Sequence, residues 1–427
     1  MTSDGGGRPG EAFVWIWLPG ATEPVVAGRV AVDGAIHVFN YGRSYVDRRD
    51  AIAIYAPELP LQRGAIMPEA PLTMAGCLRD AAPDAWGRRV IINRLTGLKG
   101  HAVREVECDE LTFLLNSSSD RAGALDFQWS SDRYDPREPG AATLEELHDA
   151  TRHVERGEAV PVALSNALLH GTSIGGARPK ALIETPERKF IAKFSATNDT
   201  YAVVKAEFIA MRLAARVGLD VATVELTTAS GKDVLLVERF DRVRQTTGWS
   251  RRAMVSALTM LGLDELQARH ASYADLTDII RARFTRPRET LRELFARLVF
   301  NVLVGNSDDH ARNHAAFWDG DSLTLTPAYD ICPQARGGRE VNQSMLIDGQ
   351  DKRSRLETCR AAAQSFLLDG GQARAIIDQQ VATIRDAWRD VCDEAQLSAI
   401  DRGVLWRRQF LNDYAFDGYA GGPPAAS

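Results

Sequence analysis

The sequence predicts an α+β fold in which two β-rich regions precede a long, mainly helical region. Short runs such as AFVWIWL and VVAGRVAV are rich in β-branched and aromatic residues and are separated by Gly, Pro and Asp, which indicates strands between positions 13 and 71. A second strand-rich region spans 160–245. From about residue 250 the pattern is helical, apart from segments near 305–335 and a loop near 336–352.

The first β-rich region continues into helices, and we expect it to form an α+β accessory domain over residues 13–150. A helical pattern runs from Thr73 to Thr96, and TLEELHDATRHVE predicts another helix that ends at Glu155. Thr143 precedes Glu146 by three residues, which is the spacing of a capping box at a helix N-terminus.

The two ends of the chain are expected to be disordered. MTSDGGGRPGEA predicts a leader over 1–12, and the glycine- and proline-rich end predicts a tail over 416–427. The leader lacks the apolar core of a signal peptide. No uncharged apolar run approaches the roughly 18 residues of a membrane-spanning helix. We therefore expect a cytoplasmic protein.

Composition narrows the class of protein further. The chain has 427 residues, of which 45% are hydrophobic, enough for a large core shared among several domains. A net charge of −6 argues against a chain that binds nucleic acid mainly by electrostatic attraction. Five scattered cysteines without a CxxC pair argue against a disulfide framework or a zinc site and favour a reducing compartment.

A glycine-rich stretch opens the second β-rich region and is a candidate phosphate-binding loop. HGTSIGGARPKALIE contains Gly171, Gly175 and Gly176, which permit close approaches that larger residues forbid. Backbone amides of such a loop can point at phosphate oxygens. Pro179 removes one amide donor and stiffens the segment. Because glycine-rich turns are most often only turns, the stretch alone is weak evidence for nucleotide binding.

A lysine and a glutamate beyond this loop are expected to pair. KALIE and KFIAKFSA predict two strands joined by a turn, and Lys193 lies in the middle of the second. In the next helical segment, Glu207 shares one face with three apolar residues, Val203, Met211 and Ala214. A carboxylate on that face costs free energy unless a cation pairs with it. The alternative is that Glu207 lies at the margin of the apolar stripe and reaches water.

VATVELTT and DVLLVERFDR predict two further strands, and the second ends at Glu238 and Phe240. Glycine loop, lysine strand, glutamate helix and two strands follow one another in the order of a protein-kinase small lobe. VERF would then be the hinge, where backbone groups meet adenine. We therefore predict a protein-kinase-like bilobal fold, with a β-rich small lobe over 151–245 and an all-α large lobe over 246–415.

The stretch GNSDDHARNHAAF follows an apolar run, LRELFARLVFNVLV, that predicts a buried helix anchoring a polar loop. A kinase catalytic loop needs an aspartate that orients the acceptor hydroxyl and, five residues later, an asparagine that holds a metal. Asp308 and Asn313 have this spacing. Asp309 is the alternative base, but Asn313 would then lie at +4. FWDGDSLTLTPAYDIC predicts a hairpin followed by Asp330, a further ligand for a hard-oxygen Mg²⁺ site.

Three other side chains of this stretch are candidates for a role at the site. His310 and His314 could bind a transition metal, but no third His or Cys follows nearby, so we expect His310 to support the loop by hydrogen bonding. Arg312 either neutralises charge on a transferred phosphoryl group or lies exposed in solvent.

Taken together, these stretches resemble the HipA family, the serine/threonine kinase toxins of bacterial type II toxin–antitoxin modules. The stretches that carry the resemblance are TSIGGARPKALI, KAEFIAMRLAARVGL, LLVERFDR, VGNSDDHARNHAAF and LTPAYDICP. GRVAVDGAIHVFNY and APDAWGRRVI are similar to the accessory N-terminal domain of that family, so the resemblance covers about residues 13–415. The motifs are specific in their ordered combination and not singly.

The resemblance implies ATP and Mg²⁺ as cofactors. It implies Asp308 as the catalytic aspartate, Asn313 and Asp330 as metal ligands, and Lys193 as the lysine that binds ATP phosphates. The remaining candidates for ATP binding are Gly171, Ser173, Gly175, Gly176, Glu207, Glu238, Phe240 and His310. It also implies an inactivating autophosphorylation of Ser173, with the adjacent Thr172 as a substitute, because a phosphate on this loop would repel the nucleotide.

The resemblance further implies a HipB-like helix-turn-helix antitoxin as partner, a complex with that antitoxin, and contact with DNA only through it. A protein target such as an aminoacyl-tRNA synthetase would lead to growth arrest through uncharged tRNA. Two alternatives stay open. One is a small-molecule phosphotransferase, because D-x-H-x-x-N also resembles the loops of lipid and aminoglycoside kinases. The other is a catalytically silent co-repressor scaffold.

Overall fold

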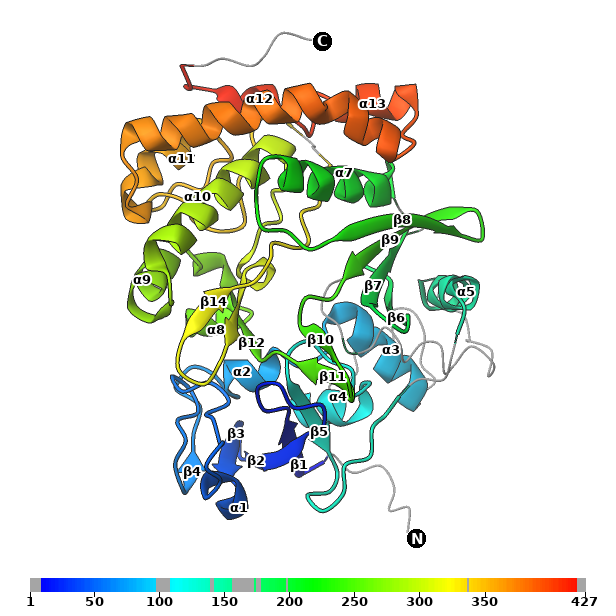
Figure 1. Ribbon diagram of the computed structural model, residues 1–427, viewed down its shortest axis with the longest axis vertical. Helices are drawn as coiled ribbons and strands as arrows, with labels where there is room; N and C mark the ends of the chain where they lie inside the picture. The colour runs from blue at the N-terminus through cyan, green and yellow to red at the C-terminus, as the bar shows by residue number, and fades with distance from the viewer. Residues whose placement is uncertain are drawn as a thin grey trace.

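The computed structural model describes residues 9–96, 108–138, 142–155, 173, 178–196, 199–335 and 338–420. Figure 1 shows three parts in space: an N-terminal sheet with short helices at the bottom, a second sheet in the middle, and long C-terminal helices at the top. The described parts contain both sheets and helices throughout, as the α+β prediction requires.

The N-terminal part is built on a five-stranded sheet with the order β4-β3-β2-β1-β5 and antiparallel pairing. Its strands are β1 (Glu11–Ile16), β2 (Val25–Asp33), β3 (Ile36–Tyr41), β4 (Ala65–Ile66) and β5 (Leu125–Gln128). Its helices are α1 (Arg43–Val46), α2 (Gly76–Arg79), α3 (Ala85–Thr96) and α4 (Glu110–Asn116). The first three strands confirm the prediction. Because β1 already begins at Glu11, the expected leader over 1–12 is two residues too long.

A four-stranded sheet with the order β6-β7-β9-β8 forms the middle part. Its strands are β6 (Lys180–Glu184), β7 (Lys189–Phe194), β8 (Val224–Ala229) and β9 (Lys232–Glu238). Ala192 and Phe194 pack with α3 and α5 (Leu144–Glu155) on one face of this sheet. The other face, with Leu235 and Val237, packs on α7 (Val203–Arg216). All of these strands and α7 were predicted.

The helix α5 begins with the predicted capping box. The Thr143 backbone N–H donates to Glu146 Oε2 over 2.8 Å, and the Glu146 N–H donates to Thr143 Oγ1 over 3.2 Å. Leu147 and Ala150 of this helix pack against the four-stranded sheet rather than the N-terminal sheet. The expected domain boundary between residues 150 and 151 therefore falls inside a helix that belongs with the middle part.

The C-terminal part is mainly helical. Its helices are α8 (Ala257–Met260), α9 (Tyr273–Arg283), α10 (Pro287–Val304), α11 (Leu356–Ala362), α12 (Gly370–Glu394) and α13 (Ala399–Leu405). None of the helices in the described ranges combines the length and the apolar character that crossing a membrane requires. The expected tail begins too early, because Tyr419 is buried and its hydroxyl donates to Asp378 Oδ1 over 2.9 Å.

The C-terminal part is not all-α, which corrects the prediction for the large lobe. A three-stranded sheet has the order β12-β13-β14, and a separate hairpin pairs β10 with β11. These strands are β10 (Arg242–Gln245), β11 (Gly248–Arg251), β12 (Met254–Ser256), β13 (Ala315–Trp318) and β14 (Leu323–Leu325). The β13–β14 hairpin was predicted. The other strands were not predicted, because they have only three or four residues, which are too few to show a period-two pattern.

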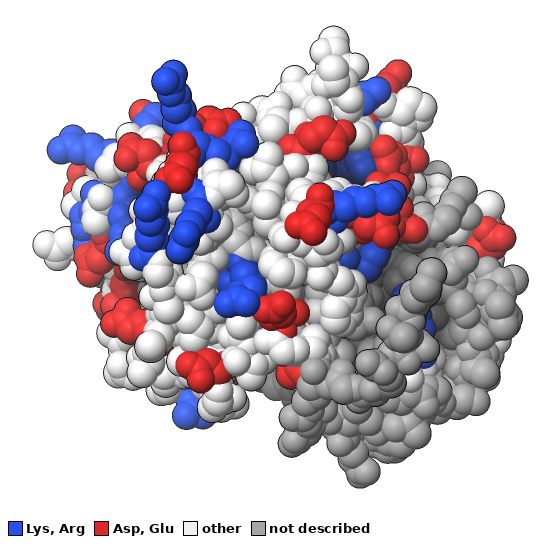
Figure 2. Space-filling model, turned by 90° about the horizontal axis from the view of Figure 1, so that it is seen from below, with Lys and Arg blue, Asp and Glu red and all other residues white. Residues whose placement is uncertain are grey.

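Basic and acidic side chains are mixed on the face seen in Figure 2, where described Lys and Arg residues lie beside Asp and Glu residues. Several exposed pairs of the N-terminal part show this mixing, such as Arg48 with Asp50 at 2.9 Å and Arg63 with Asp47 at 2.6 Å. Mixed signs create little long-range field for a polyanion. The described residues of this face therefore do not form a surface of one charge sign.

The buried helix α10 ends at a glycine that places the polar loop behind it. Gly305 has φ of +71°, the left-handed conformation that commonly terminates helices. A Cβ at this position would lie 2.8 Å from the backbone oxygen of Gln409. The end of α10 and the start of the loop are therefore fixed by a backbone geometry that only glycine adopts without strain.

Gly305→Ala is expected to lower the free energy of unfolding by about 1–3 kcal/mol, because the left-handed backbone and the Gln409 contact both oppose a methyl group. Chemical denaturation followed by circular dichroism measures the change. Gly403→Ala is the matched control, because Gly403 lies within α13 and nothing would approach its Cβ within 4 Å. That control should gain about 0.5–1 kcal/mol. Equal stability of Gly305→Ala and the wild type would contradict the conclusion that the end of α10 requires glycine.

Candidate active site

A cavity of ≈ 1140 Å³ lies where the three parts of the molecule meet. Its wall includes strand β7 and helix α7 of the middle part, the loop after α10, and segments of the N-terminal part between α2 and α3 and before β5. Pockets for small ligands usually measure about 300–1,000 Å³, so this cavity has room for a ligand of nucleotide size and more. It contains most of the side chains that the sequence singled out.

Lys193 is a cation of the cavity wall. On β7, buried Phe190, Ala192 and Phe194 alternate with residues that face the cavity, so Lys193 points away from the apolar side of the sheet. Its Nζ donates to Glu207 Oε1 over 2.5 Å and also to Asp330 Oδ1. The predicted Lys193–Glu207 pair is therefore confirmed, and Glu207 does not reach water.

The pairing explains how Glu207 is tolerated in the core. Glu207 is only 2% exposed on α7, and an isolated buried carboxylate would be costly. Burial alone would lower the pKa of Lys193, but the charges of Asp330 and Glu207 raise it above its ordinary value. Lys193 therefore stays protonated and links a helix of the middle part to a loop of the C-terminal part.

Asp330 follows β14 in a backbone conformation that few residues adopt. Its φ is +58°, in the left-handed region, which aspartate visits more readily than most residues. Burial tends to raise the pKa of Asp330, but the charges of Lys193 and Lys180 lower it below its usual range. The carboxylate is therefore ionised at the cavity wall. Such local strain is typical of functional sites.

Asp308 and Asn313 lie next to each other on the loop after α10. Both line the cavity, and the Asn313 Nδ2 donates to the backbone oxygen of Asp308 over 3.2 Å. This bond uses the amide nitrogen of Asn313 and leaves its oxygen for another partner. Partial burial and the nearby charge of Asp330 raise the pKa of Asp308, while His310 lowers it.

The structure distinguishes Asp308 from its neighbour. Asp309 is 1% exposed and does not line the cavity. Its carboxylate accepts from the Tyr273 hydroxyl and lies 2.9 Å from His314 Nε2, and both of these partners are buried. Asp309 therefore ties the loop to helix α9, and Asp308 is the carboxylate that reaches the cavity.

His310 also lines the cavity, and its buried Nδ1 has no hydrogen-bond partner among the described residues. The expected support of the loop by His310 hydrogen bonding is therefore not seen from that nitrogen. His314 instead belongs to the Asp309 contact. Across the described ranges, no three His, Cys, Asp or Glu side chains are grouped as metal ligands would be. The geometry thus gives no support to a transition-metal site at these histidines.

The hinge candidates and Arg312 reach the same cavity. Glu238 ends β9, and Phe240 packs its ring against Phe317 and Tyr329 with centroids 5.9 and 5.6 Å away. Arg312 is not exposed in solvent as one alternative expected. Its guanidinium pairs with Glu265 and approaches the carboxylates of Asp84 and Asp80 within 3.8 and 4.0 Å.

Most of the candidate phosphate loop lies outside the described residues, including Gly171, Thr172, Gly175 and Gly176. Ser173 is described. It is 2% exposed, it does not line the cavity, and its hydroxyl donates to the backbone oxygen of Asp120 over 2.9 Å.

Sequence reasoning missed several residues of the cavity wall. Lys180 is buried and lies directly across from Lys193 in the β6–β7 pairing. Burial and the charge of Lys193 lower the pKa of Lys180 to about 8. KALIE was predicted as a strand, but only its register with β7 identifies Lys180 as a cavity residue. The N-terminal contributions include Asp80, Asp84, Arg88, Glu110 and residues 122–125, for which no local sequence signal exists.

A family model described as the HipA-like C-terminal domain matches residues 172–388, which is half of the chain. The chain belongs to the HipA family. A second model, the HipA N-terminal domain, matches residues 21–128. The two matches follow the order that the sequence motifs indicated, so the predicted family is confirmed. From here on, "N-terminal domain" means the part built on the β4-β3-β2-β1-β5 sheet.

Two individual relatives match parts of the chain at moderate identity. The putative kinase Y4mE of Sinorhizobium fredii is 34% identical over 147 residues, which cover 33% of each chain. The serine/threonine-protein kinase toxin HipA of Shewanella oneidensis is 28% identical over 184 residues, which cover 37% of this chain and 42% of that protein. The chain thus spans less than half the length of these two curated relatives.

A solved structure of HipA shares the whole architecture. In the complex of Shewanella oneidensis HipA, HipB and operator DNA, the similar chain has a TM-score of 0.69 at 19% identity, over 95% of this chain and 99% of that one. At this low identity the similarity is evidence for the fold alone. It confirms the α+β, protein-kinase-like architecture that the order of motifs predicted.

Proposed function

We propose that this HipA-family chain is an ATP-dependent serine/threonine protein kinase that acts as the toxin of a toxin–antitoxin pair. The observation that carries the proposal is the double pairing of Lys193. One lysine holds Glu207 of α7 and Asp330 of the loop after β14, at a cavity that Asp308 and Asn313 also line. This is the arrangement that positions ATP phosphates against an acceptor hydroxyl in kinases.

Each residue takes a role that fits its surroundings. Lys193 and Lys180 would bind phosphate oxygens of ATP, and Glu207 would orient Lys193. Asp330 and the free amide oxygen of Asn313 are hard-oxygen donors that suit Mg²⁺, which when bound neutralises charge on the phosphates. Asp308 would orient the acceptor hydroxyl and accept its proton.

Three further assignments complete the nucleotide site. Glu238 and Phe240 would meet the base at the hinge, and His310 would lie beside the phosphates. We propose Ser173 as a site of inactivating autophosphorylation. Its burial against Asp120 means that the hydroxyl must leave its present position before it can receive a phosphoryl group.

One solved structure supports the proposed partners. HipA of Shewanella oneidensis was solved with HipB and operator DNA, and we propose that this chain likewise binds a HipB-like helix-turn-helix antitoxin and meets DNA only through it. The substrate would be a protein of translation such as an aminoacyl-tRNA synthetase. We propose an accessory domain that begins at residue 13 and ends before α5, a small lobe that runs from α5 to residue 245, and a large lobe over 246–415.

A small-molecule phosphotransferase is the second candidate, and one observation favours it. Three carboxylates, Asp80, Asp84 and Glu265, lie within 4.0 Å of the Arg312 guanidinium on the wall of the same cavity. An acidic surface beside Asp308 suits a small cationic acceptor such as an aminoglycoside. Such a surface also suits a basic segment of a protein, so the acceptor has to be tested directly.

The test incubates the purified chain with ATP and Mg²⁺, alone and with a panel of aminoacyl-tRNA synthetases and aminoglycosides, and measures added phosphate by mass spectrometry. We expect phosphate on a protein serine or threonine, and its loss when EDTA removes the metal. Phosphate on an aminoglycoside alone would favour the second candidate. If ATP binds but no phosphate moves to any acceptor or to Ser173, the kinase proposal fails and the silent scaffold becomes the better description.

A further inference from the structure

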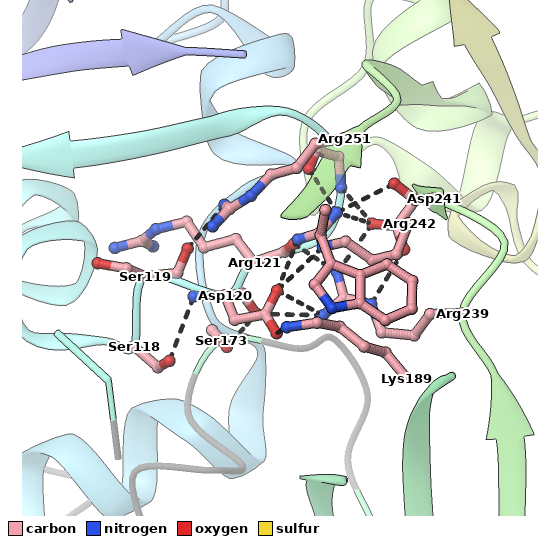
Figure 3. Close-up of polar contacts among 12 residues, drawn as sticks. Ser118, Ser119, Asp120, Arg121, Ser173, Lys189, Arg239, Asp241, Arg242 and Arg251 are labelled. Atoms are coloured by element: carbon pink, nitrogen blue, oxygen red, sulfur yellow. Dashed lines mark hydrogen bonds and ion pairs between the residues drawn. The ribbon is translucent and has the colours of Figure 1, made fainter. Parts of the chain in front are cut away.

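A short loop of the N-terminal domain contacts the hinge. Residues 119–123, between α4 and β5, lie against the hinge, which comprises residues 237–242 at and after the end of β9. Figure 3 shows the Asp120 side chain of this loop facing Arg239 and Arg242, with Lys189 and Arg251 at the edge. The Arg121 side chain points away from the hinge and pairs with Asp126 of its own domain.

Asp120 is the anion at the centre of this contact. Its Oδ1 accepts from Arg239 Nη1 over 2.9 Å and from Arg242 Nη2 over 2.7 Å, and its Oδ2 lies 3.3 Å from Lys189 Nζ. The Asp120 side chain is 21% exposed, whereas those of both arginines are almost completely buried. Burial opposes its ionisation, yet the three cations hold the pKa of Asp120 well below its usual value.

Asp241 of the hinge binds the same two arginines and also contacts the N-terminal domain. Its Oδ2 accepts from Arg239 Nη2 and Arg242 Nη1, each over 2.8 Å, and from the backbone N–H of Gly123 over 2.8 Å. Each arginine is thus shared by one carboxylate of the N-terminal domain and one of the hinge. Because burying an arginine without its anions is strongly unfavourable, losing Asp120 leaves two buried cations with half of their compensation.

Backbone oxygens of the same loop use the remaining guanidinium hydrogens. Arg239 Nη2 donates to the Arg121 oxygen over 2.6 Å, and Arg242 Nη1 donates to the Gly123 oxygen over 2.9 Å. Arg251 Nη1 donates to the Ser119 oxygen over 2.8 Å. The planar guanidinium forks therefore fix the loop in orientation as well as in distance.

This contact lies directly behind the cavity. Residues 122–125 of the N-terminal domain and 237–241 of the hinge both belong to the cavity wall. Gly123 has φ of +75° and packs against Met254, so a residue with a side chain would not fit there easily. The position of the hinge backbone at the cavity is consequently set in part by a domain outside the two lobes.

We propose that Asp120 is a positioning residue of the nucleotide site. It holds the hinge in place through Arg239 and Arg242, and the N-terminal domain thereby contributes to ATP binding. The inference rests on the proposed function, because it takes Glu238 and Phe240 as the residues that meet the base. Asp120 itself does not line the cavity and acts only through the two arginines.

Asp120→Asn tests the proposal, because it keeps the shape of the side chain and removes its charge. We expect the KM for ATP to rise about tenfold, as the loss of charge-assisted hydrogen bonds predicts, with kcat changed less than about twofold. Hydrogen exchange of a peptide covering residues 236–245 should become faster.

Asp126→Asn is the matched control. Asp126 is as buried as any carboxylate in the N-terminal domain, but it pairs with Arg121 and Arg137 of that domain, at 2.8 and 2.9 Å, and does not line the cavity. This variant should lose thermal stability without a change in the KM for ATP or in exchange of the hinge peptide. A purely structural role of Asp120 would make the two variants behave alike.

Arg242→Lys is the second variant in case Asp120→Asn does not fold. It keeps the positive charge but not the fork geometry, so KM should rise in the same direction with a smaller effect. Unchanged hinge exchange and unchanged KM in both variants would overturn the inference. A wild-type chain that binds no ATP would refute the proposed function instead, and hinge exchange would still decide whether Asp120 holds the segment.

Discussion

Asp308→Asn is expected to reduce the rate of phosphoryl transfer about 10²–10⁴-fold, the usual contribution of a positioned general base. The Asp308 carboxylate reaches the cavity, and the backbone of the residue, not its side chain, accepts the Asn313 hydrogen bond. The substitution should therefore leave the loop in place. Affinity for ATP should stay within a few-fold of the wild type. Single-turnover transfer and fluorescence titration with ATP measure the two quantities separately.

Asp309→Asn is the control for this prediction, because it changes the adjacent carboxylate by the same chemistry. Asp309 is buried against Tyr273 and His314, and His314 and the Tyr273 hydroxyl together lower its pKa although burial opposes this. We expect a loss of stability and a smaller loss of transfer. Normal transfer in Asp308→Asn together with complete loss in a folded Asp309→Asn would exchange the two roles.

Lys193→Met is expected to abolish detectable ATP binding and to lower the free energy of unfolding by about 3–5 kcal/mol, the usual cost of leaving a buried charge unpaired. The methionine fills similar volume but leaves Glu207 without its partner in the core and Asp330 without its link to the middle part. Urea denaturation measures the stability, and calorimetry with Mg²⁺ and ATP measures the binding.

A double variant separates the two effects of Lys193→Met. Adding Glu207→Gln removes the orphaned charge, so the double variant should recover much of the lost stability while ATP binding stays absent. Recovery of binding together with stability would mean that Lys193 acts only as a structural partner of Glu207. Full stability of the single Lys193→Met variant would show that Glu207 is not held as the structure describes.

Sequence patterns found the parts of the site that depend on local spacing. Lys193 follows from strand alternation, Glu207 from helical spacing, and Asn313 from its distance along the loop after Asp308. The five-residue spacing to Asn313 favoured Asp308 over Asp309 from the sequence, but it could not show where the Asp309 side chain lies. Only the contact of Asp309 with Tyr273 and His314 assigns it to the interior.

Features that depend on register or on distant segments could not be predicted. Lys180 reaches the cavity because β6 pairs with β7 in one particular register, and a shift by one residue would turn it to the other face. Asp120 lies more than a hundred residues before Arg239 and Arg242, and the sequence around Asp120 contains no pattern that predicts either partner. The helix α5 was predicted correctly but was placed with the N-terminal sheet instead of the four-stranded sheet, because that packing also depends on distant segments.

The contact between Asp120 and the hinge also sets an order of events on the ribosome. The N-terminal sheet is complete once β5 has been made, but Arg239 follows Asp120 by 119 residues. At about 5–20 residues per second, that interval lasts about 6–24 s. Asp330 emerges later still, 137 residues after Lys193. A growing chain has therefore made all strands of the N-terminal sheet long before it has made the hinge arginines that Asp120 holds and the Lys193–Asp330 pair of the cavity.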